Sequence, residues 1–169
     1  MKSAVVFYSH YGNTAYVVDR FCDVLRAQGK ADVFELEYLH AKKGLLRRFV
    51  YRIFPFMVRL SPINLDLKEY DLLFLGIPVW GGKPSAPVSK YMLTCKNIAG
   101  KKIICCYVYG IEASARKCAK YVERTLQRKG CSEIFNIYFP WSRISDEEFL
   151  DQTVRTSMDK ISLEAYPTP

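Results

Sequence analysis

Short apolar runs alternate with helical patterns along this chain, and this alternation constrains the fold more than any other feature. Runs at residues 2–8, 70–77, 101–109 and 134–139 are typical of strands that are buried on both faces of a parallel sheet. Residues 31–37 alternate apolar and acidic side chains, which predicts a fifth strand at a sheet edge. The pattern therefore predicts an α/β fold, with a five-stranded parallel sheet covered by helices on both faces.

Apolar residues recur at helical spacing in the segments between these strands. We expect helices over residues 15–25, 85–93, 112–129 and 146–163, the last with Ser145 as its N-cap. The chain has 169 residues, which is enough for one full hydrophobic core. We therefore interpret residues 1–164 as a single domain and 165–169 as a short C-terminal tail.

The six cysteines show no C-x-x-C spacing, and only two histidines accompany them. This pattern favours buried, reduced thiols over a zinc or iron–sulfur site, so we expect no metal. No apolar run reaches the roughly 20 residues of a membrane-spanning helix. The N-terminal run is interrupted by Ser9 and His10, which argues against a signal peptide. We expect a soluble, cytoplasmic protein.

The loop at residues 9–14 joins the first strand to the first helix, where ligands of open parallel sheets bind. Its hydroxyl and amide side chains and its backbone N–H groups can converge on an anion at the positive end of the helix. Gly12 lets the backbone approach that anion closely. Because the loop has no Lys or Arg, it favours a phosphate that is held rather than transferred. The alternative is that Ser9 and Asn13 merely complete the turn and cap the helix.

The loop at residues 76–85 follows the third strand and places Trp80 among glycines and prolines. A large aromatic side chain in such a turn is suited to covering a planar ligand. The alternative is that Trp80 folds back onto the core. Tyr109 and Gly110, after the next strand, offer a second aromatic contact at the same sheet edge, although Tyr109 could simply finish its strand.

These two loops carry a family resemblance. Residues 8–14 (YSHYGNT) resemble the phosphate loop of flavodoxins and related flavoproteins, and residues 76–80 (GIPVW) with 84–88 (PSAPV) resemble their flavin-ring loop. Tyr11 replaces the hydroxyl residue usual in flavodoxin loops and looks more like the quinone-reductase branch of this superfamily. The chain is also basic, whereas flavodoxin electron carriers are usually acidic. The resemblance implies a flavodoxin-like three-layer sandwich with strand order 2-1-3-4-5.

The resemblance further implies FMN as the cofactor, with ring contacts from Trp80 and Tyr109. The residues expected to bind it are Ser9, His10, Tyr11, Gly12, Asn13, Thr14, Pro78, Val79, Trp80, Gly81, Gly82, Tyr109 and Gly110. A flavin itself takes up the electrons, so no catalytic side chain is assigned.

Other ligand sites of α/β folds do not fit these loops. A receiver domain needs acidic residues at the ends of the first and third strands, where this chain has Ser9 and Gly76-Ile77-Pro78. A low-molecular-weight phosphatase needs a cysteine in the first loop, followed by an arginine. A dinucleotide-binding domain needs G-x-G-x-x-G, and the first loop has one glycine.

Positive charge is concentrated in an amphipathic insertion at about residues 40–64, with a helix expected at 45–54 and ended by Pro55. The net charge of the chain is +8, and this insertion contains no acidic residue. It could be a solvated face, bind an acidic redox protein or NAD(P)H, or touch an anionic membrane through residues 42–59. Nucleic acid is not expected, since no reading motif accompanies the charge. Its cations are Lys42, Lys43, Arg47, Arg48, Arg52 and Arg59.

Three functions are consistent with this sequence. The first is an FMN-binding electron carrier for a protein partner. The second is an FMN-dependent NAD(P)H reductase of quinones or similar acceptors. The third is a flavodoxin fold without a flavin that serves as an interaction module.

Overall fold

The computed structural model describes residues 1–37, 55, 58–61, 63 and 66–165 of the chain. Five parallel strands form its sheet: β1 (Lys2–Phe7), β2 (Lys30–Glu35), β3 (Leu72–Trp80), β5 (Lys102–Tyr109) and β6 (Ile134–Pro140). They lie in the order β2-β1-β3-β5-β6, and the short β4 (Lys83–Pro84) pairs antiparallel with β3. The predicted strand order 2-1-3-4-5 and the three-layer α/β class are confirmed.

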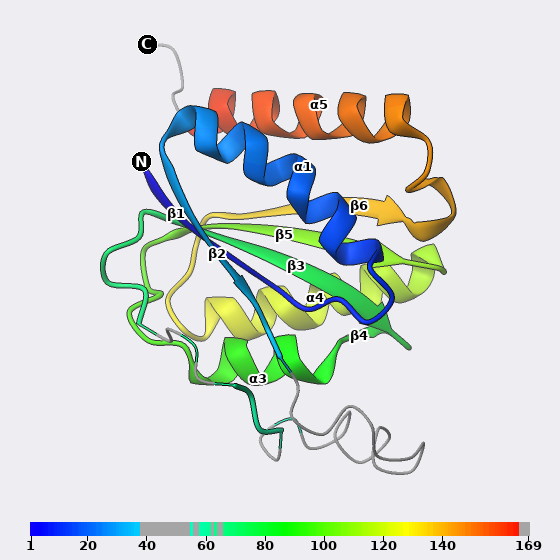
Figure 1. Ribbon diagram of the computed structural model, residues 1–169. Coiled ribbons are helices and arrows are strands. Elements are labelled where there is room, and N and C mark those ends of the chain that lie inside the picture. Colours follow the sequence, from blue (N-terminus) through cyan, green and yellow to red (C-terminus); the bar gives the residue numbers. More distant parts are fainter. Residues whose placement is uncertain (38–54, 56–57, 62, 64–65, 166–169) are drawn as a thin grey trace.

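Within the described part of the chain, helices cover both faces of the sheet (Figure 1). The helices α1 (Asn13–Gln28) and α5 (Glu147–Ala165) lie on one face, and α3 (Ala86–Thr94) and α4 (Glu112–Gln127) lie on the other. Side chains of each strand alternate between the two faces. Thus Val5 packs in the core under α1 and α5, whereas its neighbour Val6 packs in the core over α3 and α4.

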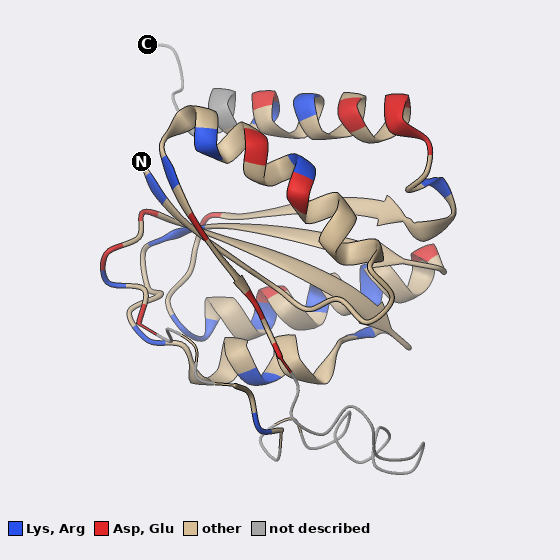
Figure 2. Cartoon of the chain, viewed as in Figure 1, with Lys and Arg blue, Asp and Glu red and all other residues tan. Residues whose placement is uncertain are grey.

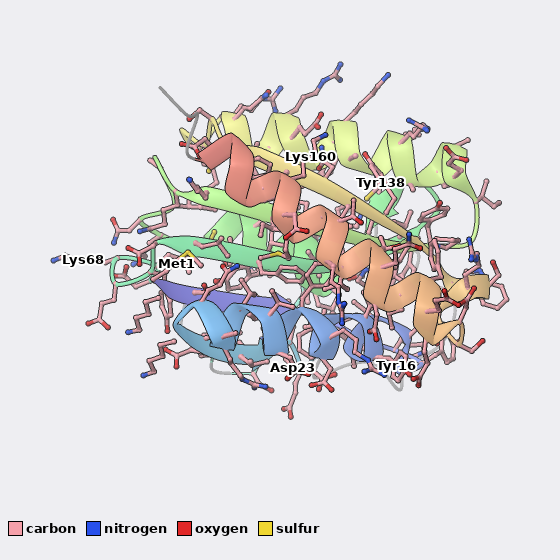
Figure 3. All side chains as sticks on the ribbon, turned by 90° about the horizontal axis from the view of Figure 1, so that it is seen from above. Met1, Tyr16, Asp23, Lys68, Tyr138 and Lys160 are labelled. Atoms are coloured by element: carbon pink, nitrogen blue, oxygen red, sulfur yellow. The ribbon has the colours of Figure 1, made fainter. Side chains whose placement is uncertain are left out.

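Seen from above the first layer, α1 and α5 run side by side across the sheet (Figure 3). Tyr16 Oη on α1 donates a hydrogen bond of 3.0 Å to Glu147 Oε1 at the start of α5. The cap of α5 is Asp146, whose Oδ1 accepts from the backbone N–H of Phe149 at 3.0 Å. The predicted Ser145 cap is therefore wrong by one residue, because the carboxylate of Asp146 reaches the free N–H of the first turn.

All six cysteines are buried and unpaired, as their pattern predicted: Cys22, Cys95, Cys105, Cys106, Cys118 and Cys131. Burial raises the pKa of the Cys105 thiol to about 12, so it stays protonated and packs as an apolar group.

The helix expected at 45–54, most of the basic insertion at 40–64 and the tail beyond Ala165 lie outside the described residues. Within the part of the chain that is described, no helix is both long enough and apolar enough to cross a membrane.

Candidate functional site

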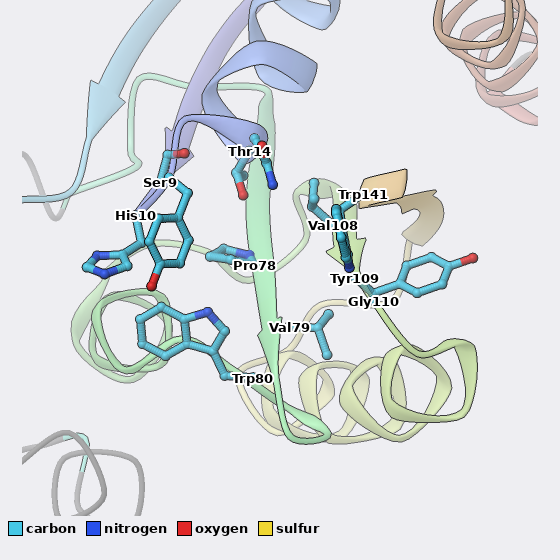
Figure 4. Close-up of a pocket in the computed structure, with 12 residues that line it drawn as sticks. Ser9, His10, Thr14, Pro78, Val79, Trp80, Val108, Tyr109, Gly110 and Trp141 are labelled. Atoms are coloured by element: carbon cyan, nitrogen blue, oxygen red, sulfur yellow. The ribbon is translucent and has the colours of Figure 1, made fainter. Parts of the chain in front are cut away.

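A pocket of about 190 Å³ lies at the carboxyl ends of the central strands (Figure 4). The chain leaves β1 toward β2 on one side and crosses to β3 on the other, so the strand order reverses between β1 and β3. Ligands of open parallel sheets bind at such a reversal. The pocket is lined by Ser9, His10, Tyr11, Asn13, Thr14, Pro78, Val79, Trp80, Val108, Tyr109, Gly110 and Trp141.

The first wall of the pocket is the loop between β1 and α1. Gly12 precedes α1 with a φ of +85°, a left-handed conformation that favours glycine. Ser9 Oγ accepts a hydrogen bond of 3.2 Å from the backbone N–H of Ala15 in the first turn. Ser9 thus completes the turn, as the alternative interpretation holds, and also lines the pocket. Gly12 shapes the loop but does not line the pocket.

The start of α1 is pressed against β3 at Gly76. A Cβ atom on Gly76 would lie 2.5 Å from Phe7 Cβ, 2.7 Å from Val18 Cγ2 and 3.2 Å from Thr14 Cγ2. Only a residue without a side chain fits between these groups. The resulting contact fixes the N-terminus of α1, with its unpaired N–H groups, beside the pocket. No acidic residue occupies the first turn of α1 to oppose an anion there.

The second wall is the end of β3. Gly81 and Gly82, with φ of +56° and +79°, form the two-residue turn of a hairpin in which Trp80 pairs with Lys83. Positive φ at both positions is the geometry of the type I′ hairpin turn. Both glycines therefore position the hairpin, while Pro78, Val79 and Trp80 line the pocket.

Trp80 belongs to a cluster of rings at this wall. Its indole meets the ring of Tyr8 edge-on at 5.8 Å and that of His10 at 6.1 Å. His10 in turn meets Tyr11 at 4.4 Å, and its Nδ1 lies 3.2 Å from Tyr8 Oη. Trp80 also packs against the core over α3 and α4, so the two interpretations of this residue hold together.

The third wall contains a tryptophan that the sequence analysis missed. Trp141 begins the 3₁₀ turn η2 (Trp141–Arg143) after β6, and 57% of its surface is exposed. Its indole lies over the backbone of Gly110 and stands on the opposite side of the pocket from Trp80 (Figure 4). Its place directly after the last strand is a signal that could have identified it.

Tyr109 reaches the pocket only in part. Its phenol points away from the pocket centre in Figure 4. Burial and the nearby carboxylate of Glu112 raise its pKa above the ordinary value. The indoles of Trp80 and Trp141 are therefore the large aromatic side chains that stand on opposite sides of the pocket (Figure 4).

Among the residues that the structure describes, no Lys, Arg, Asp or Glu lines the pocket. Neutral donors gather at the end of the loop before α1, and aromatic surfaces gather at the other end. Such an arrangement can bind a phosphate through hydrogen bonds and a flat ring through stacking. It holds no acid–base pair among these residues.

The sequence matches no protein-family model and no curated protein. Solved structures do match it over most of their length. An NADH:FMN oxidoreductase in its apo form is 13% identical with a TM-score of 0.68, over 100% of this chain and 92% of that one. A flavodoxin from the domain Archaea is 16% identical with a TM-score of 0.59, over 96% of this chain and 99% of that one. Oxidised flavodoxin 2 from Bacillus cereus is 20% identical with a TM-score of 0.57, over 95% of this chain and 99% of that one.

Identities at this level bear on the fold alone. The fold is the same by three observations. These are the parallel strand order β2-β1-β3-β5-β6, the two helical layers and the similarity to these solved structures. This chain has the flavodoxin-like fold.

Proposed function

We propose that this protein binds FMN in the pocket at the ends of β1, β3 and β5 and transfers electrons through it. The observation that carries the proposal is the division of one uncharged pocket into a hydrogen-bonding end at the start of α1 and an aromatic end between Trp80 and Trp141. This division matches the two halves of a flavin phosphate. FMN-related proteins among the structural neighbours support the same ligand class.

The phosphate would be held by the loop before α1. Ser9, Asn13 and Thr14 supply hydroxyl and amide groups, and the helix N-terminus supplies backbone N–H groups. Gly12 does not line this pocket, but its left-handed turn, with a φ of +85°, leads the chain into α1, where Asn13 and Thr14 line the pocket.

The ring would lie at the aromatic end. Pro78, Val79 and Trp80 form one side, and Trp141 forms the other. Tyr8 contacts His10 through one hydrogen bond and a stacked ring pair, and it contacts Trp80 through an edge-on ring pair. A bound flavin supplies the electron acceptor and donor, whereas these side chains bind it, orient it and exclude water.

The size of the pocket supports electron transfer to a partner. Its volume of about 190 Å³ is smaller than the roughly 300–1,000 Å³ of pockets that enclose a whole ligand. FMN would leave part of itself outside, and an exposed ring edge is what a redox partner must reach. Partners we propose are an acidic redox protein or NAD(P)H. The basic segment at 42–59 could also contact an anionic membrane. Six buried, unpaired thiols support a cytoplasmic location.

A second candidate is an FMN-dependent NAD(P)H reductase of quinones or similar acceptors. Tyr11 is 81% exposed beside the pocket mouth, and Trp141 is also largely exposed. Both offer aromatic surface on which a nicotinamide could stack over a bound flavin. One structural neighbour is an NADH:FMN oxidoreductase.

One experiment tests both candidates. The purified protein is loaded with FMN, its visible spectrum is recorded, and NAD(P)H is added without oxygen. A yellow protein that NAD(P)H leaves unchanged supports the electron carrier, and rapid bleaching supports the reductase. A protein that stays colourless after FMN is added would refute the flavin site and leave an interaction module.

A further inference from the structure

The exposed face of α4 carries a row of cations. Lys117, Lys120, Arg124 and Arg128 follow one another at spacings of three, four and four residues, and all four are exposed. At 1.5 Å per residue this row, here called the α4 stripe, is about 16 Å long. Figure 2 shows the blue positions along this helix.

The positive charges of the α4 stripe are not balanced by acidic side chains of the described part of the chain. Among the described residues, none of its four side chains forms an ion pair, and the two acids of α4 are engaged elsewhere. Glu112 pairs with Arg116, and Glu123 accepts a hydrogen bond from Asn136 on β6. Like charges at these helical spacings destabilise an isolated helix. Arg124 and Arg128 complement the negative end of the helix, but Lys117 and Lys120 have no such role within the domain.

The α4 stripe begins at the candidate site. The Lys117 side chain packs on the hairpin turn, with its Cδ 3.0 Å from where a Cβ of Gly82 would lie. Lys83, also exposed, pairs with Trp80 across the same hairpin. Gly110, which lines the pocket, is separated from the first residue of α4 by Ile111 alone. A molecule that covers the stripe therefore also reaches the pocket mouth.

We propose that the α4 stripe and Lys83 are the docking surface for an acidic redox protein, which exchanges electrons at the pocket mouth. This inference rests on the proposed flavin site and specifies where its partner binds. A row of cations about 16 Å long extends beyond the diphosphate group of one dinucleotide, so its length suits the surface of a protein.

The composition of the stripe favours an acidic protein over a membrane or a nucleic acid as its partner. A helix that lies on a membrane needs a row of large apolar side chains beside its cations, whereas within the described residues α4 (Glu112–Gln127) exposes none and Ile111 at its N-cap is a single one. No nucleic-acid reading motif accompanies the charge. The opposite layer is unsuited to an acidic partner, because α5 exposes Glu147, Glu148 and Asp159.

The test measures binding of a small acidic [2Fe–2S] ferredoxin by calorimetry at about 20 mM and about 200 mM NaCl. The variant Lys117→Gln/Lys120→Gln removes the two stripe charges that have no role in the helix. We expect about tenfold weaker binding at low salt and a smaller loss of affinity between the two salt concentrations. The matched control Arg155→Gln/Lys160→Gln removes the same charge from α5 and should bind within about twofold of the wild type.

The binding measurement is run with flavin-free and with FMN-loaded protein. Stripe-dependent binding in the flavin-free protein supports the docking surface even if FMN loading fails, so the two proposals fail separately. Equal weakening in the stripe and control variants, or no binding by the wild type, would overturn the docking surface. Stripe-dependent binding to phosphatidylserine vesicles or duplex DNA, without binding to ferredoxin, would overturn it as well.

Discussion

The indole of Trp141 lies so close over Gly110 that a Cβ atom there would sit 2.6 Å from Trp141 Nε1. Gly110 does not have a positive φ, so its backbone accepts alanine and only the indole must move. We expect Gly110→Ala to turn Trp141 into solvent, because that side chain is already 57% exposed. The chain has two tryptophans. In a Trp80→Phe background, the emission of Trp141 should therefore shift to the red, with a stability change below about 1 kcal/mol.

Because the indole leaves the pocket, Gly110→Ala should also lower FMN affinity, and a double-mutant cycle checks the cause of that loss. Once Trp141→Ala has removed the indole, adding Gly110→Ala should lower FMN affinity no further. Fully additive losses would mean that Gly110 acts on the ligand without Trp141.

Each tryptophan of the pocket should contribute to FMN binding through its ring. We expect Trp80→Ala and Trp141→Ala each to raise the Kd for FMN about fivefold, which corresponds to about 1 kcal/mol of stacking. Trp80→Phe and Trp141→Phe should keep most of the affinity. Flavin fluorescence, which stacking on an indole quenches, measures the Kd. An alanine variant that binds FMN like the wild type would remove that tryptophan from the ring site.

Gly76→Ala should destabilise the whole domain. The new Cβ meets Phe7 Cβ, which the strand fixes, and Val18 Cγ2 on α1. Overpacking of this kind costs about 1–3 kcal/mol, measured as the shift of the urea unfolding midpoint. Adding Val18→Ala should restore part of the loss, since it removes one of the two closest contacts. A variant as stable as the wild type would mean that β3 and α1 separate easily.

The cap of α5 predicts a contrast between two adjacent residues. Asp146→Ala should lower the Tm by about 2–4 °C, whereas Ser145→Ala should leave it unchanged. Thermal unfolding followed by circular dichroism measures both. Equal losses in the two variants would contradict the assignment of the cap to Asp146.

The same cap should depend on pH. The Arg143 guanidinium, 2.8 Å from Asp146 Oδ2, and the N–H of Phe149 hold the pKa of Asp146 below its ordinary value of 3.8. Because folding lowers this pKa, the stabilisation is complete above about pH 4 and is lost as the pH falls through the folded value. The Tm difference between wild type and Asp146→Ala should therefore be constant from about pH 5 to 8 and shrink in acid.

The strands and their order could be predicted because burial on both faces leaves an unbroken apolar run. The register of β3 and β5, for example, pairs Phe74 with Ile104 inside two such runs. The same reasoning located the walls formed by Ser9 and Trp80, since both follow such a strand. Strand ends in an open parallel sheet share one edge whatever their loops contain.

The place of Trp141 directly after the last strand is the same kind of signal, but its contact with Gly110 could not be predicted in this way, because that contact is made only in the folded chain. The turn η2 brings its indole over Gly110, which is 31 residues earlier in the sequence. The hairpin was a different case. Gly81-Gly82 is a strong hairpin signal, and the structure shows that turn; the expected contact of its backbone groups with a flavin edge stays a prediction. Asp146 was missed because adjacent Ser and Asp are both good caps, and only the geometry of the turn decides between them.

The uncharged lining of the pocket has a practical consequence for purification. Neutral donors and stacked rings are weakly sensitive to dissolved ions, whereas the row of cations on α4 is strongly sensitive to them. A wash in concentrated salt should therefore strip bound acidic proteins from this molecule while leaving its yellow colour in place. Preparation in dilute buffer should keep both the bound acidic proteins and the yellow colour.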